Sequence, residues 1–80
     1  MGSRRLGTVL HLSSSSGNLF LKAEGAARIG DAVLNDDGKR VGTVFDIFGP
    51  VSSPFVAVKP SVEAPRRYVG EPLFWERRRR

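Results

Sequence analysis

The sequence lacks cysteine altogether and contains a single histidine, His11. The absence of cysteine excludes disulfide bonds and zinc sites that need thiolate ligands. With only one histidine as well, the chain is not expected to hold a transition metal, and nothing in it points to another cofactor. The sequence also lacks an apolar run long enough to cross a membrane and a secretory signal at its amino end. The composition therefore predicts a soluble protein of the cytoplasm without membrane partners.

Acidic residues are few, and the excess of positive charge is concentrated at one end of the chain. Thirteen Lys and Arg stand against eight Asp and Glu, and residues 77–80 are four consecutive arginines. Without these four arginines, the rest of the chain has nine basic and eight acidic residues, so it is nearly neutral. Eighty residues suffice for one domain with a small core. We expect a single folded domain at residues 4–75 and a disordered basic tail at residues 76–80.

What the chain does contain is a series of short runs rich in β-branched and aromatic residues, separated by turn signals. Strands are predicted at residues 5–12, 19–22, 29–34, 39–48, 55–59 and 68–75. Gly7, within the first of them, indicates a bulge or a close approach of another backbone segment. Asn-Asp-Asp-Gly at residues 35–38 is typical of a hairpin turn. No segment has a convincing helical pattern, so the six short strands predict an all-β domain, a small closed β-barrel.

Alternation along these strands predicts which side chains fill the barrel. The expected core is Leu6, Leu10, Leu19, Leu21, Val33, Val44, Val56, Val58 and Leu73. The long strand at residues 39–48 does not alternate cleanly, because large apolar residues occur on both of its faces. One face is expected to line the barrel interior, and the other to be covered by a neighbouring loop or by a partner protein.

No combination of side chains in the sequence satisfies the usual requirements of a catalytic site. His11 could pair with a serine of residues 13–16, but a flexible polar loop provides no fixed geometry and no orienting acid. Asp36 and Asp37 are explained by the turn that contains them. Asp46, an acid within an apolar strand, is a candidate acid–base group, although a hydrogen bond to backbone amides near the end of its strand explains it better. The chain is therefore not expected to be an enzyme.

The run at residues 41–56 contains the most distinctive surface feature that the sequence predicts. Gly49 and Pro50 interrupt it, and Pro54 precedes its second half, which indicates two strands joined by a rigid corner. The corner itself, from Phe48 to Val51, is apolar. Because rigidly held loops often carry function, this corner is a candidate docking surface for another protein.

Residues 5–11, 29–33, 41–51, 54–60 and 68–71 resemble the core domain of the glycine-arginine-rich protein of box H/ACA ribonucleoproteins. The resemblance covers nearly the whole chain, and Asp-Ile-Phe-Gly-Pro-Val at residues 46–51 is its most specific part. It implies a six-stranded barrel of the elongation-factor type that has no catalytic role and binds the catalytic domain of the guide-dependent pseudouridine synthase. The family is thought to assist substrate RNA loading and release through a mobile loop of the synthase.

The same resemblance implies that the guide RNA and the other H/ACA proteins are only indirect partners. The extended glycine-arginine-rich flanks of eukaryotic members are absent here, so the chain resembles an archaeal member, a monomer within the complex. The residues implied to meet the synthase are Ile47, Phe48, Gly49, Pro50, Val51, Pro54, Phe55 and Tyr68. Ser52 and Ser53 occupy positions where basic residues are frequent in the family, which weakens the case for a charged contact there.

Two other interpretations remain open. An RNA-binding barrel would act through its own basic and aromatic residues. Its candidate RNA contacts are Arg77, Arg78, Arg79 and Arg80, and its candidate stacking platforms are Phe20, Phe48, Phe55, Tyr68 and Trp75. An adaptor barrel of the photosynthetic-reaction-centre type shares the pattern Val-Gly-x-Val-x-Asp at residues 41–46, although the Phe-Gly-Pro corner disfavours it.

Overall fold

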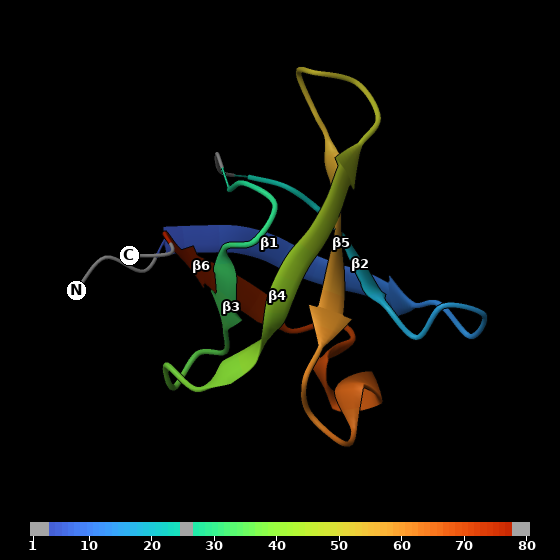
Figure 1. Cartoon of the computed structure of the whole chain (residues 1–80), viewed down its shortest axis with the longest axis vertical. Helices are drawn as coiled ribbons and strands as arrows, with labels where there is room; N and C mark the ends of the chain where they lie inside the picture. Colours follow the sequence, from blue (N-terminus) through green and yellow to red (C-terminus); the bar gives the residue numbers. More distant parts are fainter. Residues whose placement is uncertain (1–3, 25–26, 78–80) are drawn as a thin grey trace.

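Six antiparallel strands close into a barrel in the computed structural model, which describes residues 4–24 and 27–77 (Figure 1). The strands are β1 (Arg4–Leu12), β2 (Leu19–Lys22), β3 (Ala32–Leu34), β4 (Arg40–Phe48), β5 (Phe55–Pro60) and β6 (Pro72–Glu76), and a 3₁₀ helix, η1 (Pro65–Tyr68), precedes the last strand. The closed six-stranded all-β fold expected from the sequence is therefore confirmed. Within this described part of the chain, no helix is long and apolar enough to cross a membrane.

The strands follow the order β1-β2-β5-β4-β3-β6 around the barrel. Three pairs of consecutive strands, β1–β2, β3–β4 and β4–β5, are hairpins with short loops. The pairing of β2 with β5 joins the first hairpin to the others, and β6 lies between β3 and β1. Figure 1 shows β4 and β5 running upright across β1. The last strand in sequence is thus the one that closes the barrel.

The β3–β4 turn has the chemistry that its sequence predicts. Oδ1 of Asn35 accepts hydrogen bonds from the backbone N–H groups of Asp37 and Lys39, both at 2.9 Å. Gly38 adopts a φ of 84°, which costs glycine little because it has no Cβ. The asparagine side chain and the glycine together reverse the chain between the two strands.

Two irregularities in β1 decide which of its side chains enter the core. Its register shifts against β6 just before Gly7, and against β2 just after Val9. As a result Leu6 and Val9 are both buried, while Leu10 is 52% exposed. The prediction that Leu10 lies in the core is wrong, because strict alternation fails across a bulge. The other eight predicted core residues are all buried: Leu6, Leu19, Leu21, Val33, Val44, Val56, Val58 and Leu73.

The structure of β4 explains why apolar residues occur on both of its faces in the sequence. Its register shifts near Val41 against β3, and again after Val44 against β5. Val41 and Val44 are buried and Ile47 packs against the core, so the inward positions are three residues apart rather than two. Both predicted faces therefore contribute to the core, and Val41 is a core residue that alternation does not predict. Phe45 and Phe48 remain 55% and 45% exposed.

The helix η1 occupies a segment for which the sequence predicts a loop followed by a strand. Pro65 lies at its first turn, where the missing N–H costs no hydrogen bond. The chain then turns back against β1: Gly70 N–H donates to the carbonyl of Val9 at 2.9 Å, and Val9 N–H donates to the carbonyl of Glu71 at 3.0 Å. Because of this turn, β6 begins only at Pro72, the strand position that proline tolerates best.

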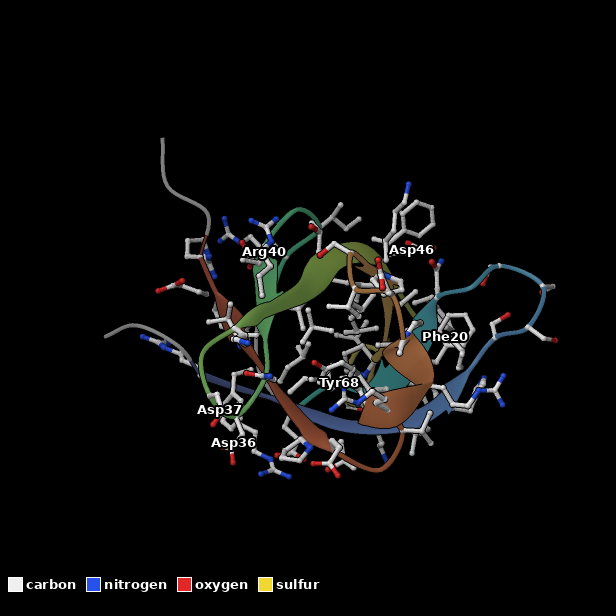
Figure 2. The ribbon with its side chains drawn as sticks, turned by 90° about the horizontal axis from the view of Figure 1, so that it is seen from below. Phe20, Asp36, Asp37, Arg40, Asp46 and Tyr68 are labelled. Atoms are coloured by element: carbon white, nitrogen blue, oxygen red, sulfur yellow. The ribbon has the colours of Figure 1, made fainter. Side chains whose placement is uncertain are left out.

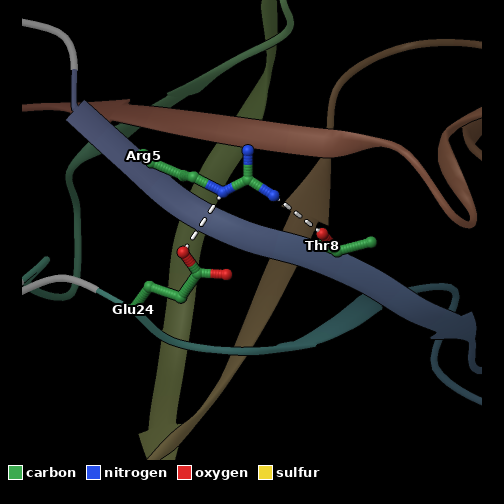
Figure 3. A network of polar contacts seen from close by, with 3 residues as sticks. All are labelled: Arg5, Thr8 and Glu24. Carbon is green, nitrogen blue, oxygen red and sulfur yellow. Dashed lines mark hydrogen bonds and ion pairs between the residues drawn. The ribbon is translucent and has the colours of Figure 1, made fainter.

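Gly7 lies where the backbone at the end of β2 comes close to β1. A Cβ atom at this position would overlap the carbonyl oxygen of Lys22, which confirms the close approach that the sequence predicts. This close approach is held by a hydrogen bond from Glu24 N–H to a carbonyl of β1 at 2.7 Å. Figure 3 shows Nε of Arg5 at 3.2 Å from Oε1 of Glu24, with Nη2 of Arg5 donating to Oγ1 of Thr8 at 3.1 Å. Both side chains of this ion pair are about half exposed, so it contributes at most about 1 kcal/mol.

The sequence predicts a tail from residue 76, whereas in the structure Glu76 still belongs to the barrel and Arg77 contacts it. Glu76 is the last residue of β6 and pairs with Ala32. Nε of Arg77 lies 3.6 Å from Oδ2 of Asp31, and its guanidinium group lies 5.0 Å from the ring centroid of Trp75. The remaining predicted tail residues, Arg78, Arg79 and Arg80, lie outside the described residues.

Replacing Asp31 by alanine is expected to lower the free energy of unfolding by about 2 kcal/mol. Asp31 is only 3% exposed, and its Oδ2 accepts a hydrogen bond from Arg28 N–H at 2.8 Å. The substitution deprives that partly buried donor of its acceptor and removes the carboxylate that attracts Arg77. Equilibrium urea denaturation measures the loss.

Two further variants test whether the loss of stability depends on the buried position and the hydrogen bond of the Asp31 carboxylate. Asp31→Asn keeps an oxygen acceptor for the Arg28 N–H, so it should lose less stability than Asp31→Ala. Asp46 is exposed and, among residues 4–24 and 27–77, accepts a hydrogen bond from the next backbone N–H alone. Asp46→Ala should therefore change the free energy of unfolding by about 0.5 kcal/mol or less. Equal losses for Asp31→Ala and Asp46→Ala would contradict a structural role for Asp31.

Candidate functional site

The β4–β5 loop, residues 49–54, forms an apolar corner at one end of its hairpin. Val51 is 98% exposed, and Phe48, the last residue of β4, is 45% exposed. Phe55 begins β5 directly opposite Phe48. We call the residues brought together here the corner: Phe48, Gly49, Pro50, Val51, Pro54 and Phe55.

Three backbone features hold the corner in place. Gly49 has a φ of 92°, and a Cβ atom there would come within 3.1 Å of a neighbouring phenyl ring of β5. Ser53 N–H donates to the carbonyl of Pro50 at 3.1 Å, which closes a turn within the loop. Ala23 N–H donates to the carbonyl of Pro54 at 2.9 Å, which ties the loop to the chain that follows β2. The apolar side chains are therefore presented from a backbone that is fixed at several points.

Next to the corner, four aromatic rings form a continuous row on the outside of the barrel. The ring centroids lie 5.1 Å apart for His11 and Phe20, 6.0 Å for Phe20 and Phe48, and 5.9 Å for Phe48 and Phe55. His11 pairs with Phe20 between β1 and β2, and Phe48 pairs with Phe55 between β4 and β5. Together with Leu10, the rings line an apolar depression of about 310 Å³. We call these five residues the aromatic face.

The sequence alone does not predict that the residues of the aromatic face lie together. The sequence suggests Phe20 as one of several scattered stacking residues, and His11 as a weak acid–base candidate. Both residues lie near Phe48 because β5 lies between β2 and β4 in the barrel. No local sequence pattern predicts this strand order. One signal was present, because His11 and Phe20 flank the predicted hairpin loop at residues 13–18 symmetrically and therefore pair across it.

Not all residues proposed for the interface or for stacking come together at the corner. Ile47 is half-buried and packs against the core. Tyr68 lies in η1, also packs against the core, and is at the opposite end of the barrel from the β4–β5 loop (Figure 1). Trp75 is 3% exposed, and the guanidinium groups of Arg4 and Arg77 lie 5.8 and 5.0 Å from its ring centroid. Trp75 is therefore a core residue and not an open stacking platform.

The side chains considered for acid–base chemistry are far apart or used in local structure. Figure 2 shows Asp36 and Asp37 in the β3–β4 turn, well separated from Asp46. Oδ1 of Asp46 accepts a hydrogen bond from the next backbone N–H at 2.9 Å, and Oγ of Ser13 accepts one within its own loop at 3.3 Å. The ring of His11 contacts a phenyl ring edge-on. Among the residues that the structure describes, no group of three or more His, Asp or Glu side chains is placed to hold a metal ion.

Comparison with known proteins identifies a relative along nearly the whole chain. A scan against models of protein families finds no match. The chain is 35% identical, over 89 aligned positions, to an uncharacterized protein of Methanothermobacter thermautotrophicus, and the alignment covers 96% of each chain. The alignment therefore spans nearly the whole barrel. The chain belongs to the same family as this Methanothermobacter protein.

Proposed function

We propose that the chain is a non-catalytic subunit of a guide ribonucleoprotein of the H/ACA type. In this proposal the corner binds the catalytic domain of the pseudouridine synthase, and the barrel assists loading and release of the substrate RNA. The observation that carries the proposal is the exposed apolar corner, in which Val51 is 98% exposed on a loop held by two backbone hydrogen bonds. The closed six-stranded barrel is also the architecture that the resemblance to the H/ACA glycine-arginine-rich protein implies.

The corner has the composition of a protein-binding surface and not that of a solvated loop. Residues 47–58 contain no charged side chain, although surface turns are usually rich in polar residues. Apolar side chains on a fixed backbone lose little conformational entropy when a partner covers them, which favours association. A partner that fully buried Val51 would gain about 1.5–3 kcal/mol, and covering the 45% of Phe48 that is exposed would gain about half as much.

The proposal assigns the chemistry to the partner. The synthase supplies catalysis and the guide RNA supplies specificity, so the barrel needs a binding surface and neither an acid–base group nor a cofactor. The chain would act as a monomer within the complex, in the cytoplasm of an archaeal cell. The guide RNA and the other H/ACA proteins would be its indirect partners.

Pro50→Glu is expected to abolish co-purification with the synthase. Pro50 is exposed in the isolated barrel, whereas a bound partner would enclose the new carboxylate in an apolar contact without a counter-charge. Such a buried, unpaired charge costs about 3 kcal/mol, which corresponds to an affinity about 100-fold weaker. A pull-down with the tagged synthase, followed by titration calorimetry, measures the loss.

Val69→Glu is the matched control for this experiment. Val69 is 40% exposed and follows η1, at the other end of the barrel from the corner, so a carboxylate there should leave synthase binding unchanged. Thermal unfolding should be close to that of the wild type for both variants, since both side chains are exposed. If Pro50→Glu still co-purifies with the synthase, the corner is not the interface. If the wild type does not bind the synthase, the proposed function is wrong.

A further inference from the structure

The aromatic face is suited to bind a ligand of a different kind from the protein that the corner binds. We propose that it binds single-stranded RNA by stacking nucleobases on its rings. Identification of that strand as the substrate RNA rests on the proposed function, whereas the stacking itself rests on the geometry of the face. Leu10, His11 and Phe20 belong to the face but not to the corner, so they would remain open to the RNA while the corner holds the synthase. Phe48 and Phe55, which the two surfaces share, would be open to RNA in the isolated barrel.

The rings of the aromatic face are arranged as a stacking surface requires. Neighbouring centroids are 5.1–6.0 Å apart, and the planes of Phe48 and Phe55 differ by only 26°. Phe20 meets Phe48 edge-on, at 86°, so ring faces of different orientation adjoin one another. Exposed aromatic side chains on neighbouring strands of small β-domains are the means by which single-strand-binding proteins stack successive bases.

Two exposed lysines lie on the outer surface of the same strands. Lys22 of β2 pairs with Phe55 of β5. Lys59 lies two residues beyond Ala57, and Ala57 pairs with Phe20, so Lys59 is the diagonal neighbour of that phenylalanine on the same side of the sheet. Each lysine is therefore within reach of a phosphate that follows a base stacked on these rings.

A third cation lies beside the histidine end of the face. Arg66 of η1 lines a second depression together with His11, Leu12, Ser14 and Val69, and this depression adjoins the first through His11. These positive charges flank aromatic rings. Such an arrangement is typical of sites that bind single-stranded nucleic acids, in which the cations contact phosphates and the rings stack on bases. Lysine is depleted at protein–protein interfaces, whereas it commonly contacts phosphates. The part of the face outside the corner therefore fits single-stranded RNA better than it fits a second protein.

Two acidic residues lie near this pattern: Asp46, and Glu63, which lines a further depression together with Arg66. Asp46 pairs with Ala57, on the β4 side of the face, and its carboxylate is engaged by the backbone N–H of Ile47. The three cations, Lys22, Lys59 and Arg66, outnumber these two carboxylates, so the net charge near the row of rings is positive.

Fluorescence anisotropy of a labelled oligouridylate, titrated with the full chain at low salt, tests the proposal. Phe20→Leu keeps most of the apolar volume but removes an aromatic face, so it should bind about 10-fold more weakly. Phe20→Tyr restores the ring and should bind like the wild type. Phe45→Leu is the matched control, because Phe45 is 55% exposed on β4 but does not line the depression. Lys22→Gln and Lys59→Gln should each reduce the slope of log affinity against log salt by about 0.7.

The outcomes separate this inference from the proposed function. Pro50→Glu should lose the synthase and keep the oligouridylate, and Phe20→Leu should do the reverse. The inference is overturned by a wild type that does not bind the oligonucleotide, by a Phe20→Leu variant that binds it normally, or by an equal loss for Phe45→Leu. It is also overturned if Phe20→Leu loses the synthase instead, since the aromatic face would then belong to the protein interface. Retention of the synthase by Pro50→Glu would count against the corner alone.

Discussion

Gly7→Ala is expected to lower the free energy of unfolding by about 3 kcal/mol. Gly7 has a φ of 151°, where side chains with a Cβ are strained, and a Cβ atom would overlap the carbonyl oxygen of Lys22 and lie 3.0 Å from Cδ1 of Leu21. The carbonyl cannot move away cheaply, because β2 is paired with β1 on one side and with β5 on the other. For a domain of this size the melting temperature should fall by about 15 °C, measured by circular dichroism.

Gly70→Ala is the control that separates steric overlap from backbone strain. Gly70 also has a positive φ, 87°, but a Cβ atom there would meet no heavy atom within 4 Å. This variant should therefore lose only the conformational part, about 1 kcal/mol. Equal losses at the two positions would show that β2 approaches β1 less closely at Gly7 than the structure describes.

Leu21→Ala is expected to lower the free energy of unfolding by about 3 kcal/mol, far more than the same truncation at Leu10. Leu21 is fully buried on β2, so its truncation removes apolar contacts and leaves a cavity in a core that has little other material. Leu10→Ala removes the same atoms from a side chain that is 52% exposed, and should cost about 1 kcal/mol or less. Urea denaturation of the two variants provides the comparison. Similar losses would mean that Leu10 is buried after all, as simple alternation predicts.

The burial of Leu10 and of the other predicted core residues shows where alternation along a strand predicts the core of this barrel and where it fails. Alternation placed Leu19, Leu21, Val56 and Val58 correctly, because β2 and β5 pair with each other without a register shift. It failed at Leu10 because a bulge depends on the partner strand, and one sequence does not reveal where its partner shifts.

The same reasoning applies to the candidate site. The corner could be predicted from consecutive residues, since Gly49 and Pro50 interrupt two β-rich runs and turn chemistry is local. The aromatic face could not, since its rings come from four strands that become neighbours only in the closed barrel. Tyr68 was assigned to the interface by resemblance, and a helical turn that no local signal predicts places it at the other end of the barrel.

The position of β6 between β1 and β3 also determines how the chain can fold during synthesis. The hairpins made by β1 to β5 involve residues close in sequence, whereas β6 must find β1, more than sixty positions upstream as in the pairing of Arg4 with Trp75. Such long-range contacts form late and slowly. Until residues 72–76 leave the ribosome, β1 and β3 each expose an unpaired edge with free N–H and C=O groups, and an exposed edge can pair with other chains. The nascent barrel is therefore most prone to aggregation just before its final strand emerges.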